Sequence, residues 1–294
     1  TSTVADTDKI LICANGAYGE RMGDIARCQR LNYVMYHEHY ANIPSAEHIQ
    51  SLLEQDPAIT HVAMVHSETT TGILNDIEAV GKVCRSMGKT FIVDAMSSFG
   101  GVDIPVKDWH IDYLISSANK CIQGVPGFSF IIANREKLKS CKGIARSLSL
   151  DLYDQWVQME KDGKWRFTSP THTVLAFAKA LEELKQEGGI QARHRRYTEN
   201  NHSLIEQMKQ LGFDSYIGRE YQSPIITTFL YPEQGTFCFD DMYHYIKDRG
   251  YAIYPGKLTE LDTFRIGNIG EIYLEDINTL CAIIENYLKE HCNG

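Results

Sequence analysis

The chain has 294 residues, of which 43% are hydrophobic and 23% are charged, a composition typical of a globular protein with one or two domains. Its formal net charge of −9, with no basic block to offset it, argues against a nucleic-acid partner. Because no apolar run approaches the about 18 residues of a membrane span and the eight cysteines form no CxxC pair, we expect a soluble, cytoplasmic protein with reduced thiols and no membrane partner.

Short apolar segments alternate with helical patterns in the first 170 residues or so. Six segments are predicted strands, at 9–15, 32–37, 61–67, 90–96, 113–119 and 128–134. Helical patterns occupy 20–28, 45–55 and 76–87; Ser45 is a predicted N-cap, and Gly88 closes the third helix. Strands that are apolar on both faces and alternate with helices predict an α/β fold with a mainly parallel sheet, sandwiched between helices.

The pattern changes after about residue 170. A long helix over 171–187 is predicted to end at a glycine pair, and the later elements are predicted helices at 190–211, 240–250 and 274–289 and strands at 224–231, 251–255 and 264–268. We therefore predict a large α/β domain over 1–187 and a smaller C-terminal α+β domain over 188–294.

The residues that follow the strands are the candidates for a ligand site, because ligands of a parallel sheet bind beyond the carboxyl ends of its strands. Tyr18 comes after the first strand, a run of threonines at 69–71 after the third, Asp94 at the end of the fourth, and Lys120 after the fifth. Asp94 and Lys120 are separated by one strand-to-strand step, so we expect them at neighbouring strand ends.

A lysine and an aspartate in this arrangement suit pyridoxal 5'-phosphate. The lysine amine condenses with the cofactor aldehyde and moves protons, and a carboxylate keeps the pyridine nitrogen protonated. Tyr18 is suited to stack on the ring, and Arg265, at a predicted strand position, is suited to bind a carboxylate or phosphonate. Each residue also has an ordinary interpretation: Asp94 as a turn residue, Lys120 as a solvated lysine, and Arg265 as an ion-pair partner.

Other ligand classes have weaker support in the sequence. GxGxxG, GxxxxGK and GxSxG motifs are absent, which argues against nicotinamide, P-loop and serine-hydrolase sites. His37 and His39 would lie on one face of a strand, but no third ligand accompanies them, so we expect no metal site.

Five motifs together resemble a known family: HSETTTG at 66–72, FIVDAMSSFGG at 91–101, DYLISSANKCIQGVPGFSF at 112–130, KWRFTSPTHTV at 164–174 and FRIGNIGE at 264–271. The resemblance extends over essentially the whole chain and is to the 2-aminoethylphosphonate–pyruvate aminotransferases. These belong to the class V aminotransferases of the fold type I pyridoxal phosphate superfamily, alongside alanine–glyoxylate aminotransferase. The resemblance implies a seven-stranded type of sheet and a homodimer.

The resemblance also implies a reaction, the transfer of an amino group from 2-aminoethylphosphonate to pyruvate to give phosphonoacetaldehyde and L-alanine. It identifies Lys120 as the Schiff-base lysine and Asp94 as the partner of the pyridinium nitrogen. The remaining implied residues are Tyr18 as the stacking ring, Thr69 near the ring hydroxyl, Thr168 at the cofactor phosphate of the neighbouring subunit, and Arg265 for the substrate carboxylate and phosphonate in turn.

Members of the family carry an N-terminal segment with a glycine- and serine-rich loop that holds the cofactor phosphate at a helix N-terminus. Residues 1–14 do not resemble that loop, and the chain does not begin with methionine. We therefore expect this chain to be part of a longer protein and to bind the cofactor weakly by itself. Two alternatives stay open: an alanine–glyoxylate or serine–pyruvate aminotransferase, and a catalytically silent chain that serves as an assembly or binding module.

Overall fold

The computed structural model describes residues 1–232, 237–256, 258 and 260–292. The chain forms two compact units. The first contains Thr1–Glu68, Asn75–Phe99 and Ile104–Glu182, and the second contains Thr69–Leu74, Gly100–Asp103 and Glu183–Gly294. Two short segments from the first half of the sequence thus belong to the second unit, whereas the sequence pattern alone assigned them to the large domain.

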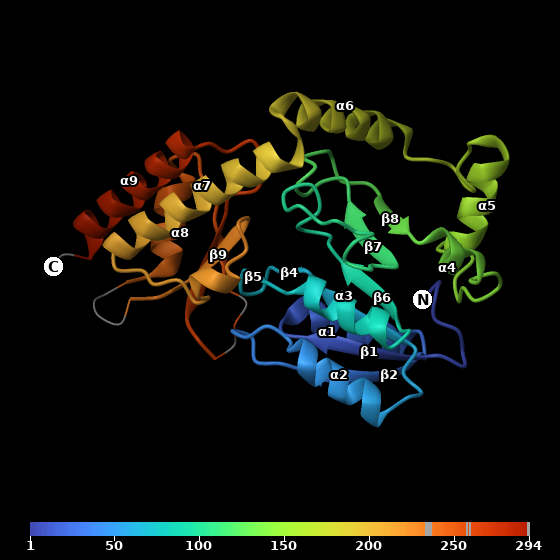
Figure 1. Cartoon of the computed structure of the whole chain (residues 1–294). Coiled ribbons are helices and arrows are strands. Elements are labelled where there is room, and N and C mark those ends of the chain that lie inside the picture. The colour runs from blue at the N-terminus through green and yellow to red at the C-terminus, as the bar shows by residue number, and fades with distance from the viewer. Residues whose placement is uncertain (233–236, 257, 259, 293–294) are drawn as a thin grey trace. The chain divides into compact units, whose positions relative to one another are not determined.

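The first unit is built on a six-stranded sheet (Figure 1). Its strands, in the order β2-β1-β3-β6-β7-β8, are β2 (Asn32–His37), β1 (Lys9–Ala14), β3 (His61–Val65), β6 (Thr90–Asp94), β7 (Tyr113–Ser117) and β8 (Ser129–Ala133). All neighbours are parallel except β7 and β8, which are antiparallel. The mainly parallel sheet is confirmed; its described strands number six, one fewer than the seven-stranded type implies.

Three helices connect strands of this sheet: α1 (Ala17–Cys28), α2 (Ala46–Gln55) and α3 (Ile77–Ser86). Two more follow β8: α4 (Arg135–Lys139) and α5 (Leu152–Asp162). The predicted N-cap Ser45 is confirmed, since its hydroxyl accepts a hydrogen bond from the His48 amide at 3.2 Å. Asp76 caps α3 in the same way, with 2.9 Å between its carboxylate and the Ala79 amide. The pattern predicted α1, α2 and α3 within a few residues but missed α4 and α5.

The two faces of the sheet are covered by different helices. On one face, Leu11 packs in a core with Ile49 of α2 and Val80 of α3. On the other face, Ile12 packs with Ala26 of α1. Because neighbouring strand residues point to opposite faces, a strand covered on both sides must be apolar throughout, as β1 is.

The second unit is a smaller α+β structure. Its antiparallel sheet has the order β10-β11-β9, with strands β10 (Tyr254–Pro255), β11 (Thr263–Gly267) and β9 (Ile226–Leu230). Its helices are α7 (Gly189–Gln210), α8 (Phe239–Lys247) and α9 (Leu274–His291), with a short 3-10 turn at Arg219–Tyr221. The core joins Phe229 and Phe264 of the sheet to apolar residues of the three helices.

Three further elements lie where the chain passes between the units. β4 (Ser67–Glu68) is the last segment of the first unit before β5 (Ile73–Leu74) of the second, and α6 (Thr171–Glu187) contains the later boundary, after Glu182. In the described part of the chain, no helix combines the length and apolar character that crossing a membrane requires.

Candidate active site

Asp94 and Lys120 follow the carboxyl ends of two neighbouring parallel strands, as the sequence predicted. Asp94 is the last residue of β6 and lies opposite Ile115 of β7. The Ala95 amide donates a hydrogen bond of 2.9 Å to the Ile115 carbonyl, so the two strand ends remain joined one residue beyond Asp94. Lys120 lies in the turn that follows β7, and its side chain is exposed.

The turn that carries Lys120 is held by its own backbone. The Gln123 amide donates to the Lys120 carbonyl and the Gly124 amide to the Ala118 carbonyl, both at 2.8 Å. A Cβ at Gly124 would lie 2.7 Å from the Ala118 oxygen, so only glycine fits this approach. The Cys121 thiol ties the turn to the segment after β6 through the Ser97 carbonyl at 3.0 Å. Lys120 therefore projects from a constrained turn.

The Asp94 carboxylate is partly buried, and no cation among the described residues forms an ion pair with it. Burial raises the pKa of Asp94, while a hydrogen bond from the Met96 amide and the charge of Arg21 oppose the rise. The Met96 amide donates to Asp94 Oδ1 at 2.8 Å. Within the described residues, Asp94 Oδ2 has no hydrogen-bond partner. Nearby along the sheet edge, the buried Ser117 hydroxyl at the end of β7 also lacks one among those residues.

Tyr18 is the second residue of α1, directly after β1. The Arg21 guanidinium lies over its ring, with 4.9 Å between the guanidinium carbon and the ring centroid. The amides of Tyr18 and Gly19 each donate a 3.1 Å hydrogen bond to Glu68 Oε2. Gly16 and Gly19 leave room for close neighbours: a Cβ at Gly16 would meet Glu68, and one at Gly19 would meet Ala14.

His66 was not singled out from the sequence, yet it lies in the same region of the first unit. Its amide donates to the Asp94 carbonyl at 2.8 Å, and its Nδ1 lies 2.9 Å from the Ser98 hydroxyl. Burial lowers the pKa of His66 to about 3, so the imidazole is neutral at physiological pH.

Thr69 and Arg265 belong to the second unit, where the fold brings them together. Arg265 on β11 is 7% exposed and donates from Nη1 to the Thr69 carbonyl at 2.9 Å and from Nε to the Pro255 carbonyl at 3.1 Å. The guanidinium also lies 5.8 Å from the centroid of the Tyr254 ring. Two backbone carbonyls thus fix the direction of this side chain.

Thr168 lies in the irregular segment between α5 and α6, and its side chain is exposed. It makes no hydrogen bond to any other residue that the structure describes. The adjacent Phe167 side chain is 52% exposed.

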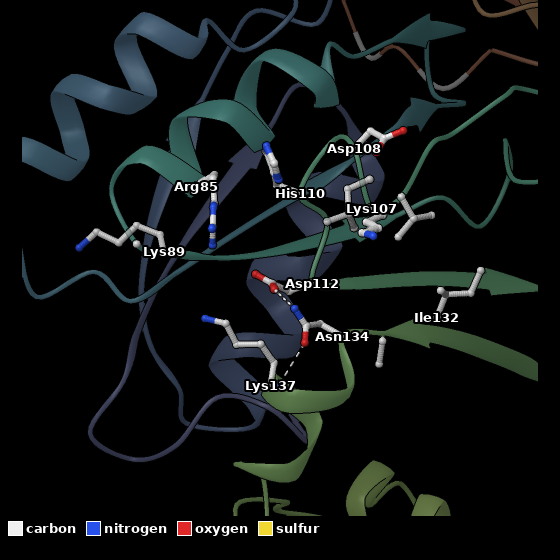
Figure 2. Close-up of a pocket in the computed structure, with 13 residues that line it drawn as sticks. Arg85, Lys89, Lys107, Asp108, His110, Asp112, Ile132, Asn134 and Lys137 are labelled. Atoms are coloured by element: carbon white, nitrogen blue, oxygen red, sulfur yellow. Dashed lines mark hydrogen bonds between the residues drawn. The ribbon is translucent and has the colours of Figure 1, made fainter.

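A hollow of about 800 Å³ in the first unit lies at the other end of the strands. Figure 2 shows part of its lining, including Arg85, His110 and the Asp112 carboxylate, which accepts a hydrogen bond from Asn134 Nδ2 at 3.2 Å. Asp112 directly precedes β7, so this hollow lies near the amino end of that strand. Asp94 and Lys120 follow the carboxyl ends, and the hollow is therefore separate from the candidate site.

Residues 2–263 match the family model described as aminotransferase class-V. The chain is 60% identical over 288 residues to the 2-aminoethylphosphonate–pyruvate transaminase of Lysinibacillus sphaericus, covering 98% of this chain and 78% of that protein. It is 54% identical over 291 residues to the bifunctional phosphonoacetaldehyde hydrolase/aminoethylphosphonate transaminase of Clostridioides difficile, covering 98% of this chain and 45% of that protein.

Solved structures share the fold at lower sequence identity. The alanine–glyoxylate aminotransferase of Nostoc sp. has a TM-score of 0.87 at 24% identity, covering 98% of this chain and 77% of that one. The pyridoxamine–pyruvate aminotransferase of Mesorhizobium loti has a TM-score of 0.88 at 22% identity, covering 99% and 76%. At these identities the likeness concerns the fold alone.

Proposed function

Because this chain belongs to the class-V aminotransferase family, we propose that it transfers the amino group of 2-aminoethylphosphonate to pyruvate, giving phosphonoacetaldehyde and L-alanine. The observation that carries the proposal is the 60% identity, over 98% of the chain, to a 2-aminoethylphosphonate–pyruvate transaminase. The alternative donor pair, alanine with glyoxylate, is named by a structural neighbour that is 24% identical, and at that identity the likeness concerns the fold alone.

We propose pyridoxal 5'-phosphate as the cofactor, and the chemistry of the donor set supports it. Asp94 is a partly buried carboxylate whose Oδ2 lacks a partner among the described residues, and burial raises its pKa. Such a group is stabilised by a cation that takes up the open oxygen, as a protonated pyridine nitrogen would. When bound, the cofactor supplies an aldehyde for covalent capture of amines and an electron sink for the bond changes at the substrate carbon.

In this proposal, Lys120 and Asp94 are the catalytic residues. The Lys120 amine would hold the cofactor covalently and would carry a proton between the reacting carbons. Its place on a turn held by backbone hydrogen bonds supports this role, because the turn fixes the position from which the amine acts. Asp94 would keep the cofactor nitrogen protonated.

Tyr18 and Thr69 would each contact the cofactor. Tyr18 would stack on the ring, and the Thr69 hydroxyl would contact the region of the ring hydroxyl. Arg265 would bind the phosphonate of the donor and the carboxylate of pyruvate in turn, since each substrate presents an anion. Two backbone carbonyls orient Arg265, and a guanidinium with a fixed direction supports this role.

We further propose a cytoplasmic homodimer in which Thr168 reaches the cofactor phosphate of the neighbouring subunit. The segment around Thr168 is unusually apolar for a surface: Leu148, Leu150, Phe167 and Leu175 are 73%, 65%, 52% and 66% exposed. Burial of this segment by a second copy would take Thr168 into the interface. The cysteines, all without disulfides, support a reducing compartment.

Reductive labelling tests the cofactor site. The purified protein is mixed with pyridoxal phosphate, reduced with borohydride and digested, and the labelled peptide is identified by mass spectrometry. We expect one label per chain on the peptide that contains Lys120, and its loss in Lys120→Arg but not in Lys142→Arg, which changes another exposed lysine. Label scattered over exposed lysines in the wild type would contradict the proposal.

Donor assays test the substrate. Alanine formation from pyruvate should require 2-aminoethylphosphonate, and alanine with glyoxylate should give no comparable turnover. The opposite preference would replace the proposed reaction with that of an alanine–glyoxylate aminotransferase. Labelling at Lys120 without turnover of either donor would indicate that the chain is catalytically silent and serves as an assembly or binding module.

A further inference from the structure

Glu68 is fully buried, with 0% exposure, although it carries a carboxylate. Its Oε2 accepts hydrogen bonds from the amides of Tyr18 and Gly19, the second and third residues of α1. A helix cannot satisfy these amides internally, and the N-cap residue Gly16 has no side chain that would. Because negative charge is stabilised at a helix N-terminus, Glu68 serves as the cap of α1 from 50 positions away in the sequence.

The capped helix begins at a place where α/β proteins bind ligands. The chain leaves β1 through α1 to reach β2 on one side, whereas β3, which precedes Glu68, lies on the other side of β1. The strand order therefore reverses between β1 and β3, and ligands bind beyond the carboxyl ends of strands at such a point. A helix N-terminus there commonly receives a phosphate. In this protein the chain's own carboxylate occupies that position.

Glu68 packs closely against the start of α1. A Cβ at Gly16 would lie 2.4 Å from Glu68 Cγ and 2.5 Å from Cδ. Gly16 has an extended backbone, with φ 172°, that any residue adopts, so space rather than backbone conformation requires glycine. The Glu68 side chain is thus packed against the turn that it caps.

We propose that Glu68 is a positioning residue of the active site. By capping α1 it fixes the backbone of Tyr18, and thereby the plane of the ring on which the cofactor stacks. The inference rests on the proposed function, because it requires Tyr18 to be that stacking ring. Glu68 acts through Tyr18, whose ring is also held by the Arg21 guanidinium on one side.

Hydrogen exchange in the cofactor-free protein tests the cap. In Glu68→Gln the side chain keeps its size but loses its charge, so the amides of Tyr18 and Gly19 should exchange about tenfold faster. Asp76→Asn is the matched control, because Asp76 is in the same unit and its carboxylate caps α3 rather than α1. Asp76→Asn should accelerate amide hydrogen exchange in the first turn of α3 and leave exchange in α1 unchanged.

Cofactor spectra test the positioning. We expect Glu68→Gln to bind pyridoxal phosphate about tenfold more weakly and to reduce the visible circular dichroism of the bound cofactor, with Asp76→Asn unchanged in both. If Glu68 acts through Tyr18, the Glu68→Gln change should have no further effect in a Tyr18→Ala background. Gly16→Ala is a second variant that keeps the carboxylate but displaces it, and it should reproduce the signature of Glu68→Gln.

Equal losses in Glu68→Gln and Asp76→Asn, or a loss that persists in the Tyr18→Ala background, would overturn the positioning role. Should Glu68→Gln not fold, the same comparisons apply to Gly16→Ala. Absence of the Lys120 label in the wild type would overturn the proposed function and this role with it. If the wild type carries the Lys120 label and the cofactor spectra of Glu68→Gln equal those of the wild type, the positioning role alone is overturned.

Discussion

Arg265 donates a hydrogen bond from Nη1 to the carbonyl oxygen of Thr69, which lies 196 positions earlier in the sequence. Its Nε donates to the carbonyl of Pro255 in β10, so one guanidinium is oriented by two segments that are distant in the sequence. A lysine has a single ammonium at the end of a flexible stem and cannot reproduce this geometry.

We therefore expect Arg265→Lys to lower kcat/KM for 2-aminoethylphosphonate and for pyruvate alike, by about 10- to 100-fold, because one arginine serves both anions. Steady-state kinetics with each substrate varied in turn will measure this. Arg249→Lys, which changes an exposed arginine that donates to the Tyr245 carbonyl, is the control and should be near wild type. A defect confined to one substrate would contradict a shared role.

Asp94→Asn should raise the stability of the cofactor-free protein at neutral pH. Burial raises the folded pKa of Asp94 above its unfolded value, so protonation favours the folded state; this stabilisation is complete below the unfolded pKa and is lost as the pH rises through the folded pKa. The cofactor-free variant should therefore melt at a higher Tm than the wild type at pH 7, and the two Tm values should converge near pH 3. Thermal melts across this range will test it, and a lower Tm of the variant at pH 7 would contradict it.

His66 should make the protein sensitive to acid. Burial lowers its folded pKa to about 3, so the stability it contributes is present above the unfolded pKa near ~6.5 and is lost as the pH falls toward 3. In that window His66 should account for a slope of about 1.4 kcal/mol per pH unit in the free energy of unfolding. Urea unfolding at several pH values should show a shallower slope for His66→Asn.

The control for this slope is His110→Asn. His110 is exposed, and its φ of 54° is a conformation that asparagine also adopts. Its slope should equal that of the wild type. Equal slopes for all three proteins would mean that His66 is not the titrating group.

Glu187→Ala should destabilise the second unit strongly. Glu187 pairs with Arg193 at 2.7 Å and with Arg196 at 2.9 Å, and the Arg193 side chain is only 3% exposed. Removal of the carboxylate breaks an ion pair to a buried guanidinium, at a cost of about 3–5 kcal/mol. Urea unfolding will measure this. Glu78→Ala, which breaks the exposed pair with Lys82, should cost no more than about 0.5 kcal/mol.

The parts of the fold that depend on local pattern were predictable. Ser45 caps its helix as expected, and the strand boundaries at β2 and the helix bounds of α6 agree with the pattern. In contrast, α5 was missed although Leu152, Trp156 and Met159 recur at helical spacing; none of its residues is buried, so the structure gives no core contact that explains the helix. The antiparallel direction of β8 could not be predicted from local pattern either, because strand direction depends on pairing with distant residues.

The candidate site shows the same division. Asp94 and Lys120 could be placed on neighbouring strand ends because strand and helix lengths set the spacing. Glu68 could not be singled out, because a glutamate beside threonines looks solvated and its partners are backbone amides, which carry no side-chain signal. The assignment of Thr69 to the second unit likewise depends on contacts that no local pattern encodes.

The contact between Gly16 and Glu68 constrains the order in which this protein can change by mutation. Any side chain at position 16 overlaps the glutamate, so a substitution there is harmful while Glu68 is present. Once position 68 carries a smaller residue, the three atoms nearest to such a side chain are gone, and the same substitution becomes less harmful. The effect of one mutation thus depends on the other, and the two positions are expected to evolve as a linked pair, a dependence that a deep mutational scan of both sites together would reveal.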